Sequence, residues 1–356
     1  MYSYNHILEW IYENVKPMRR SRQTTLGMVV AAAMRMKGVG VLALGRSMPA
    51  KTTAKHSIKR VWRFFRNSAI ELFSIQHALI RHLKPFKGRI VILADWTETV
   101  QYKTLLLSLP RDGRALPIWW RTIVKNSGEG SQICVENQAL AELSQLVPSG
   151  GEVVIAADRG FGNTRWLGEI QNRGWGYVQR LACRIEVQGP QYIGKLDELG
   201  IQAGDGAKDW GTMDITQSHP FSTRLITTYA SKAQEPWYLV TNLRDIPPEI
   251  VRLYQRRMWI EEMFRDIKNR RWGLGLDDVE LSTPQRQDRL WSVLAITYVF
   301  LCAFGAAAET EGIDEQLKAN TEGNRVMNLA RIGNYFLQIA SLSITVALAA
   351  LNRLPP

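Results

Sequence analysis

Two short apolar runs, each closed by an aspartate, constrain the fold of this 356-residue chain most strongly. RIVILAD ends at Asp95 and EVVIAAD ends at Asp158, and both runs are rich in Val and Ile. Such runs are typical of buried strands, which places each aspartate at the carboxyl end of its strand. Ligands bind at that edge in open sheets covered by helices. A lone aspartate there usually forms a turn or caps a helix, but two together favour a shared site.

A third carboxylate is expected on a helix. YQRRMWIEEMFRDIK carries Tyr254, Arg257, Glu261 and Lys268 at i, i+3, i+7 and i+14. At about 100° per residue, one continuous helix would gather these side chains within about a 60° arc. The apolar residues that could dock this helix on a core are Leu253, Ile260, Phe264 and Ile267. The polar stripe is either a solvated face with intrahelical ion pairs or the edge of a cleft.

Three carboxylates brought together from two strand ends and one helix would suit magnesium. This ion prefers carboxylate oxygens, with water completing an octahedron. Phosphoryl transfer commonly uses two such ions about 4 Å apart to hold the attacking and leaving oxygens. We therefore predict that Asp95, Asp158 and Glu261 are catalytic and bind two Mg²⁺ ions, for which Mn²⁺ could substitute.

The order of these acids resembles a known family. Asp95, Asp158 and Glu261, the last set in Y-x2-R-x3-E-x6-K, are similar in arrangement to the DDE transposases of bacterial insertion sequences with the YREK signature. ADWTET and AADRGFG also look like motif segments of that family, and the resemblance extends from about residue 20 to the C-terminus. It implies cut-and-paste cleavage at mobile-element ends and strand transfer into target DNA. Double-stranded DNA would be the partner, and the pairing of two ends implies a homodimer.

The resemblance also implies roles for the remaining polar residues of the helix. Tyr254, Arg257 and Lys268 would hold DNA phosphates near the scissile bond, Arg by its planar fork and Lys as a point charge. Two related activities stay open. A nuclease of the same fold would cut without strand transfer, and a catalytically silent DNA-binding regulator would tolerate loss of the carboxylates.

The order of segments independently favours a ribonuclease-H-like α/β core. After the first run come KTLLLSLP and ALPIWWRTI, with Asp112-Gly113 as a hairpin turn, and then helical and extended segments alternate. A three-strand meander followed by such alternation predicts a mixed sheet, not a parallel doubly wound one. The predicted divisions are a helical DNA-end-binding domain (1–85), the first part of the core (86–182), a β-rich insertion (183–234), the second part of the core (235–310) and a C-terminal helical subdomain (311–356).

The predicted insertion raises the question of a base-binding tryptophan. Its short alternating runs are rich in Gly, Asp and Thr, and contain no convincing amphipathic helix. In the resembled family, a group with an insertion here uses a tryptophan to stack on a base flipped out of the element's end. Trp237 matches that position best, and Trp210 is a weaker candidate. Alternatively, Trp237 begins a strand and packs in the core.

A basic amphipathic helix is predicted over 53–67. Its core-spaced residues are Ile58, Val61, Trp62 and Phe65, and its basic residues are Lys59, Arg63 and Arg66. The pattern alone fits either DNA phosphates or an anionic membrane surface. In the resembled family, a helical N-terminal domain recognises the element's end, so we expect these three residues to bind DNA.

Composition narrows the partners and the chemistry. A net charge of +12 and a pI near 9.7 favour a polyanionic partner. Three cysteines without a CxxC pair argue against a disulfide scaffold or a zinc site. The uncharged stretches 290–308 and 332–351 are long enough to span a membrane, but their small and polar residues favour buried helices. Without a signal-peptide pattern, we expect a cytoplasmic, nucleoid-associated protein with no membrane contact.

Overall fold

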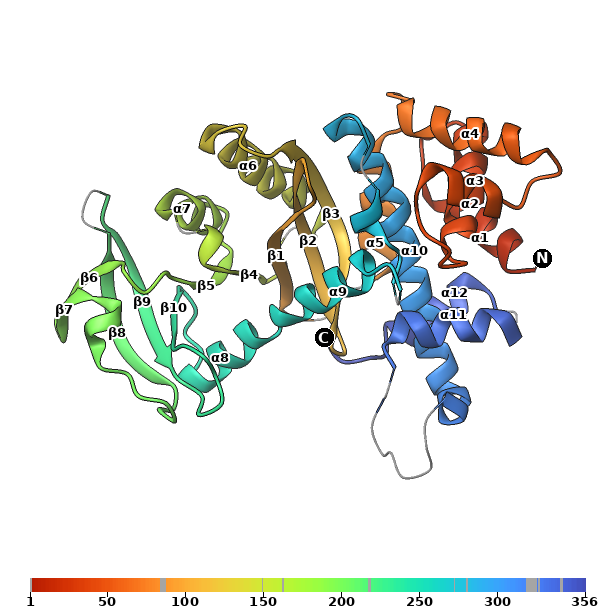
Figure 1. Ribbon diagram of the computed structural model, residues 1–356. Helices are drawn as coiled ribbons and strands as arrows, with labels where there is room; N and C mark the ends of the chain where they lie inside the picture. Colours follow the sequence, from red (N-terminus) through yellow and green to blue (C-terminus); the bar gives the residue numbers. More distant parts are fainter. Residues whose placement is uncertain are drawn as a thin grey trace.

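The computed structural model describes residues 2–83, 88–148, 150–161, 163–216, 219–271, 273–279, 281–317, 325, 327–339 and 342–356. The molecule is elongated, with strands β6–β10 at one end, strands β1–β5 in the middle and most helices at the other end (Figure 1). The chain is therefore a mixed α/β protein, as predicted.

Ten strands form one mixed sheet in the order β3-β2-β1-β4-β5-β10-β9-β8-β6-β7. The first five are β1 (Ile90–Glu98), β2 (Tyr102–Arg111), β3 (Arg114–Val124), β4 (Val153–Ala157) and β5 (Gly176–Arg180). β1, β2 and β3 pair antiparallel, whereas β4 pairs parallel to both β1 and β5. This arrangement is consistent with a ribonuclease-H-like transposase core.

The meander forms where the sequence predicts it. Asp112 and Gly113 turn the chain between β2 and β3 with φ angles of 40° and 80°. Two successive positive φ values are what a two-residue hairpin loop of type I′ requires. The predicted hairpin is thus confirmed.

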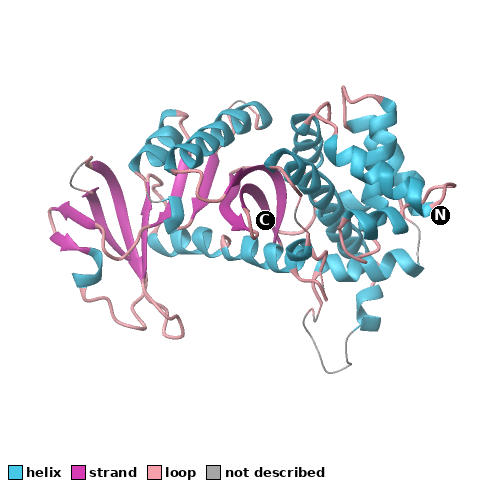
Figure 2. Ribbon diagram, turned by 45° about the horizontal axis from the view of Figure 1, so that its top comes forward, coloured by secondary structure: helices cyan, strands magenta, loops and turns pink. Residues whose placement is uncertain are grey.

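The remaining strands continue the same sheet beyond β5. They are β6 (Glu186–Gly189), β7 (Tyr192–Lys195), β8 (Lys208–Ile215), β9 (Phe221–Thr228) and β10 (Trp237–Thr241). β10 pairs antiparallel with β5 on one side and with β9 on the other. The region predicted as an insertion is therefore hydrogen-bonded to the core sheet through β10 (Figure 2).

Helices cover the two faces of the sheet. On one face lie α6 (Glu129–Leu146) and α7 (Thr164–Asn172), and on the other lie α8 (Pro247–Gln255) and α9 (Met258–Lys268) (Figures 1 and 2). The short 3-10 helices are η1 (Arg159–Phe161), η2 (Leu196–Leu199), η3 (Leu276–Asp278) and η4 (Ile313–Leu317).

The prediction of one continuous helix from Tyr254 to Lys268 is wrong at its start. Arg256 and Arg257 form a tight turn between α8 and α9, in which the Arg257 amide donates to Tyr254 O at 2.9 Å. Both residues keep right-handed helical angles, so α9 continues in nearly the direction of α8. Side-chain periodicity cannot distinguish this turn from a regular helix, because only the hydrogen-bond partner changes.

A helical region precedes the sheet. It comprises α1 (Tyr2–Asn14), α2 (Arg20–Ala33), α3 (Val41–Ser47), α4 (Ala54–Arg66) and α5 (Leu72–His82). Gly38, with a φ of 94°, and Gly40, immediately before α3, lie in the segment that separates α2 from α3.

The long helix α10 (Pro284–Thr310) joins the helical region to the sheet. It packs on β3 and on α2, α4, α5, α11 and α12. The helix is apolar and long enough to cross a membrane, but its apolar window is entirely buried inside the protein. The stretch 290–308 therefore forms a core helix, as expected.

The second apolar stretch does not form a single helix. It is divided between α11 (Leu329–Ile339) and α12 (Ile344–Leu351), and Ser343 precedes α12 as its cap. Ser343 favours a helix start because its hydroxyl can accept from an otherwise unpaired backbone N–H. The uniform hydropathy of 332–351 conceals this boundary.

Two glycines set the distance between α10 and α11. A β-carbon at Gly333 would lie 1.9 Å from Leu301 O and 2.8 Å from the Gly305 amide nitrogen. Real side chains do not approach backbone atoms so closely, and glycine therefore lets the two helices come into backbone contact.

We predict that Gly333→Ala lowers the free energy of unfolding by about 1–3 kcal/mol or more, because α10 and α11 must move apart to admit the methyl group. Urea denaturation followed by circular dichroism measures the change. Gly206→Ala is the control, since its β-carbon would meet no atom within 4 Å. Equal stability of both variants would contradict close packing at Gly333.

Candidate active site

Strand register brings the two predicted aspartates to the same edge of the sheet. Parallel pairing aligns Ala94 of β1 with Ala157 of β4, and Asp95 and Asp158 are the next residues along the two strands. Adjacent strands lie about 4.8 Å apart, so these aspartates are neighbours across the ladder.

Asp95 is a buried carboxylate in an acidic environment. Its side chain is 12% exposed, and its Oδ1 accepts the Trp96 backbone N–H at 2.8 Å. The pKa of Asp95 is raised to about 7, chiefly by burial; Arg257 opposes this rise, and the charges of Asp158 and Glu261 contribute to it. Asp158 and Glu261 are therefore close enough to Asp95 to raise its pKa.

Arg257 lies between two of the three acids. Its Nη1 donates to Asp95 Oδ2 at 3.1 Å, and its Nη2 donates to Glu261 Oε1. The Arg257 side chain is only 7% exposed, whereas that of Glu261 is 45% exposed. One buried guanidinium thus compensates carboxylates from β1 and α9.

The three acids lie close enough to interact electrostatically, but their side chains are not arranged as ligands of one metal ion. Within the part of the chain that the structure describes, no three acidic, Cys or His side chains could hold one ion as they stand. Asp158 Oδ1 accepts the Gly160 N–H at 2.7 Å, and Glu261 contacts Arg257. The donor set of three carboxylates suits Mg²⁺, and the exposed Glu261 side chain has room to turn toward the aspartates.

Tyr254 and Trp237 form an aromatic wall beside the acids. Their rings meet edge to face, with centroids 4.9 Å apart and planes at 77°. Tyr254 is buried at 1% exposure, and Trp237 is half-buried at the first residue of β10. Trp237 does begin a strand, as the alternative interpretation held, while its base-stacking role stays a prediction.

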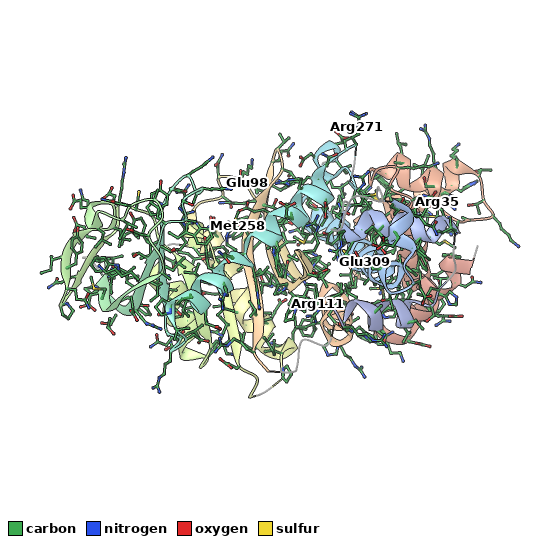
Figure 3. The ribbon with its side chains drawn as sticks, turned by 90° about the horizontal axis from the view of Figure 1, so that it is seen from below. Arg35, Glu98, Arg111, Met258, Arg271 and Glu309 are labelled. Atoms are coloured by element: carbon green, nitrogen blue, oxygen red, sulfur yellow. The ribbon has the colours of Figure 1, made fainter. Side chains whose placement is uncertain are left out.

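Lys268 lies at the far end of α9 and contacts the end of β1. Its Nζ donates to Glu98 O at 2.7 Å. Lys125 approaches the Glu98 carboxylate at 3.0 Å and Lys103 at 3.8 Å. Figure 3 labels Glu98, at the end of β1, and Met258, at the start of α9. The edge next to the acids is therefore positively charged.

Arg180 is a site residue that sequence reasoning missed. It ends β5, which is the parallel neighbour of β4, so it reaches the same edge as Asp158. Its Nη2 contacts Glu235 at 2.8 Å, and Arg159 approaches the same carboxylate at 3.5 Å. The signal available in the sequence was its position at the end of the short extended segment GYVQR.

The predicted basic residues of α4 lie on a different surface from the acids. Lys59 and Arg63 line a cavity of about 580 Å³ between α2 and α4. The other residues that line it are Ser21, Arg22, Thr25, Thr52, His56, Arg60, Phe64 and Asn67. Basic and hydroxyl side chains dominate this lining, and both are common phosphate-binding groups.

One prediction about α4 is wrong. Trp62 was expected in the core, but it is 45% exposed and carries the Arg66 guanidinium on its ring at 4.1 Å. Phe64 is buried instead, at 4% exposure. The core face is therefore rotated toward Phe64, and Trp62 joins the basic surface.

Asp95 should make stability depend on pH. A folded-state pKa near 7, above its ordinary value of 3.8, means that ionising Asp95 opposes folding. The associated stability is complete below pH 3.8 and is lost as the pH rises through about 7. We predict that Asp95→Asn stabilises the metal-free protein at pH 8 by at most about 4 kcal/mol and has little effect at pH 4. Denaturation at both pH values measures this, and a pH-independent difference would contradict it.

Comparison with known proteins finds one family that matches part of the chain. Residues 129–300 match the family model of the transposase DDE domain. The matched segment includes Asp158, Tyr254, Arg257, Glu261 and Lys268, while Asp95 precedes it. No curated protein matches the chain. The family match supports a DDE transposase, and thereby an enzyme that acts in DNA cleavage and transposition.

Proposed function

We propose that this protein cleaves DNA at the ends of a mobile element and joins those ends to target DNA. The observation that carries the proposal is the parallel register of β1 and β4, which sets Asp95 beside Asp158. Glu261 projects from α9, and its negative charge contributes to the raised pKa of Asp95. Three acids at one sheet edge beside a basic surface suit phosphoryl transfer on DNA.

Asp95, Asp158 and Glu261 would hold two Mg²⁺ ions, or Mn²⁺ in their place. When bound, the ions would activate water or a terminal 3′-hydroxyl and stabilise the departing oxygen. Asp95 would act from a rigid strand, because it pairs with Leu106 of β2 and follows directly after the last residue of β1 that pairs with β4. Glu261 would leave Arg257 and turn toward the aspartates.

The polar residues of α8 and α9 would position the DNA backbone. Once Glu261 has turned, the Arg257 Nη2 donor that it occupied would become available to a phosphate near the scissile bond, while Nη1 stays on Asp95. Lys268 supplies a point charge at the other end of α9, and the ring of Tyr254 contacts both Arg257 and Trp237. Trp237, half-buried with an edge against Tyr254, would offer its face to an extruded base.

The basic surface of α4 would bind the end of the element at a distance from the acids. Lys59 and Arg63 line the cavity between α2 and α4, and Arg66 is held over the exposed Trp62 ring. These residues would contact phosphates and set the register of the duplex. Pairing of two ends would require a homodimer, which would act in the cytoplasm on nucleoid DNA.

We predict that Asp158→Ala and Glu261→Ala each abolish cleavage of the element's terminal DNA with Mg²⁺, because each removes an oxygen ligand. Binding of the uncleaved end should stay within about two-fold of wild type, since DNA-binding energy comes mainly from phosphate contacts. A gel assay with labelled DNA measures both quantities. Cleavage that survives both substitutions would remove the catalytic assignment.

Strand transfer is tested separately, with pre-cut ends and a supercoiled target. Joining would support a transposase, whereas cleavage without joining would indicate a nuclease of the same fold. DNA binding without either reaction in the wild type would indicate a regulator.

We predict that Arg63→Ala weakens DNA binding and lowers the slope of log K against log salt by about one, because one phosphate contact is lost. Fluorescence anisotropy across a salt series measures the slope. Arg353→Ala is the control, since Arg353 is an exposed arginine after α12, far along the chain from α4. Equal slopes in the two variants would place the DNA elsewhere.

A further inference from the structure

A buried glutamate on α6 contacts the chain next to both catalytic aspartates. Glu136 is 2% exposed, and its Oε1 accepts from Trp96 Nε1 at 3.2 Å and from Gln132 Nε2 at 3.3 Å. The Asn163 side chain also hydrogen-bonds to it. Trp96 follows Asp95 directly, and Asn163 lies five residues after Asp158. One carboxylate therefore joins the two segments that carry the aspartates.

On β1, the Trp96–Glu136 hydrogen bond ties the strand to α6 on the face of the sheet opposite Asp95. Successive side chains of a strand point to opposite faces, so Trp96 reaches α6 while Asp95 points toward α9. The Trp96 amide also donates to Asp95 Oδ1 at 2.8 Å. The indole bond to Glu136 thus fixes a residue whose own backbone holds the Asp95 carboxylate.

After β4, the contact fixes a helix cap. Asn163 Oδ1 accepts the Trp166 amide at 2.7 Å and thereby caps α7. Because the amide nitrogen is the other end of the same group, a bond from Asn163 to Glu136 sets which way the cap points. Phe161, two residues earlier, is held by Gln179 Nε2 at 2.9 Å and donates its own amide to Asp158 O at 3.3 Å.

A carboxylate is a costly choice for this position. Burial raises the pKa of Glu136, and three side-chain hydrogen bonds oppose that rise. A buried charge is tolerated only when its oxygens are well hydrogen-bonded. Here the donors come from β1, from α6 itself and from the residue that caps α7. The Glu136 carboxylate therefore connects these three elements.

We propose that Glu136 is a positioning residue that sets the separation of Asp95 and Asp158 and so the geometry of their metal site. The inference rests on the proposed function, because it assigns Glu136 a role in that same site. Groups that orient metal ligands from outside typically change metal affinity about 10–100-fold when they are removed. Glu136 should act through Trp96 and Asn163 without touching DNA or metal.

The same helix provides a matched control. Glu142 also accepts an indole N–H, from Trp119 at 2.7 Å, and pairs with Arg121 at 2.9 Å. Both of its partners belong to β3, an edge strand that β2 and β1 separate from β4. Glu142→Gln therefore perturbs a similar contact without disturbing either aspartate segment.

The test measures Mn²⁺ affinity by electron paramagnetic resonance on the DNA-free, full-length protein. We expect Glu136→Gln and Trp96→Phe each to weaken Mn²⁺ binding about ten-fold or more, while Glu142→Gln stays within about two-fold of wild type. The double variant Glu136→Gln, Trp96→Phe should be little weaker than Glu136→Gln alone, because both changes break one connection. Urea denaturation of the same samples separates metal affinity from loss of stability.

Each outcome decides the inference. Wild-type Mn²⁺ affinity in folded Glu136→Gln would overturn it, whatever the stability of that variant. If Glu136→Gln does not fold, the same result in Trp96→Phe would overturn it. Mn²⁺ binding that is absent from the wild type, or unaffected by Asp158→Ala, would remove the proposed metal site and the inference with it. If Mn²⁺ binding is lost in Asp158→Ala but is normal in Glu136→Gln and Trp96→Phe, only the inference about Glu136 fails, and the proposed function stands.

Discussion

The parallel pairing of β1 with β4 creates an electrostatic conflict that the rest of the site accommodates. Two aspartates at adjacent strand ends repel each other, and the nearby Glu261 adds to the repulsion. Arg257 compensates part of this charge, because its guanidinium contacts both Asp95 and Glu261. The tight turn at Arg256–Arg257 contributes to this compensation, because it places the buried Arg257 between α8 and α9. In the proposed metal-bound state, divalent ions would supply further positive charge to an acidic site that Arg257 already compensates in part.

Binding and chemistry are assigned to separate parts of one packed body. The basic surface of α4 is remote in sequence from the acids, but α10 contacts both α4 and β3. Arg289 of α10 donates to Phe65 O at 2.8 Å, and Trp120 of β3 donates to Asp288 O at 2.9 Å. DNA held on α4 would therefore be presented to a sheet whose position relative to α4 is set by buried contacts.

The sequence was sufficient where local pattern determines structure. The strands that end at Asp95 and Asp158 follow from uninterrupted apolar runs, and the hairpin at Asp112-Gly113 follows from turn chemistry. Pattern failed where tertiary contacts decide. Trp62 has core spacing, but it stacks with Arg66 at the surface, and the turn at Arg256–Arg257 changes only hydrogen bonds. Glu136 could not be found, because its partners are distant in sequence and its own neighbourhood is that of an ordinary helix.

The burial of α10 has a consequence for how the protein is made. Its apolar residues begin near position 290, so the ribosome delivers them only after every strand of the sheet. A nascent helix of this composition would otherwise attract chaperones, lipid or other unfolded chains. β3 and helices α2, α4 and α5 have already emerged and can cover part of α10 when it appears, but its most extensive contacts are with α11 and α12, which follow it in the chain. This apolar helix is therefore covered completely only when the two C-terminal helices have been made and have packed on it.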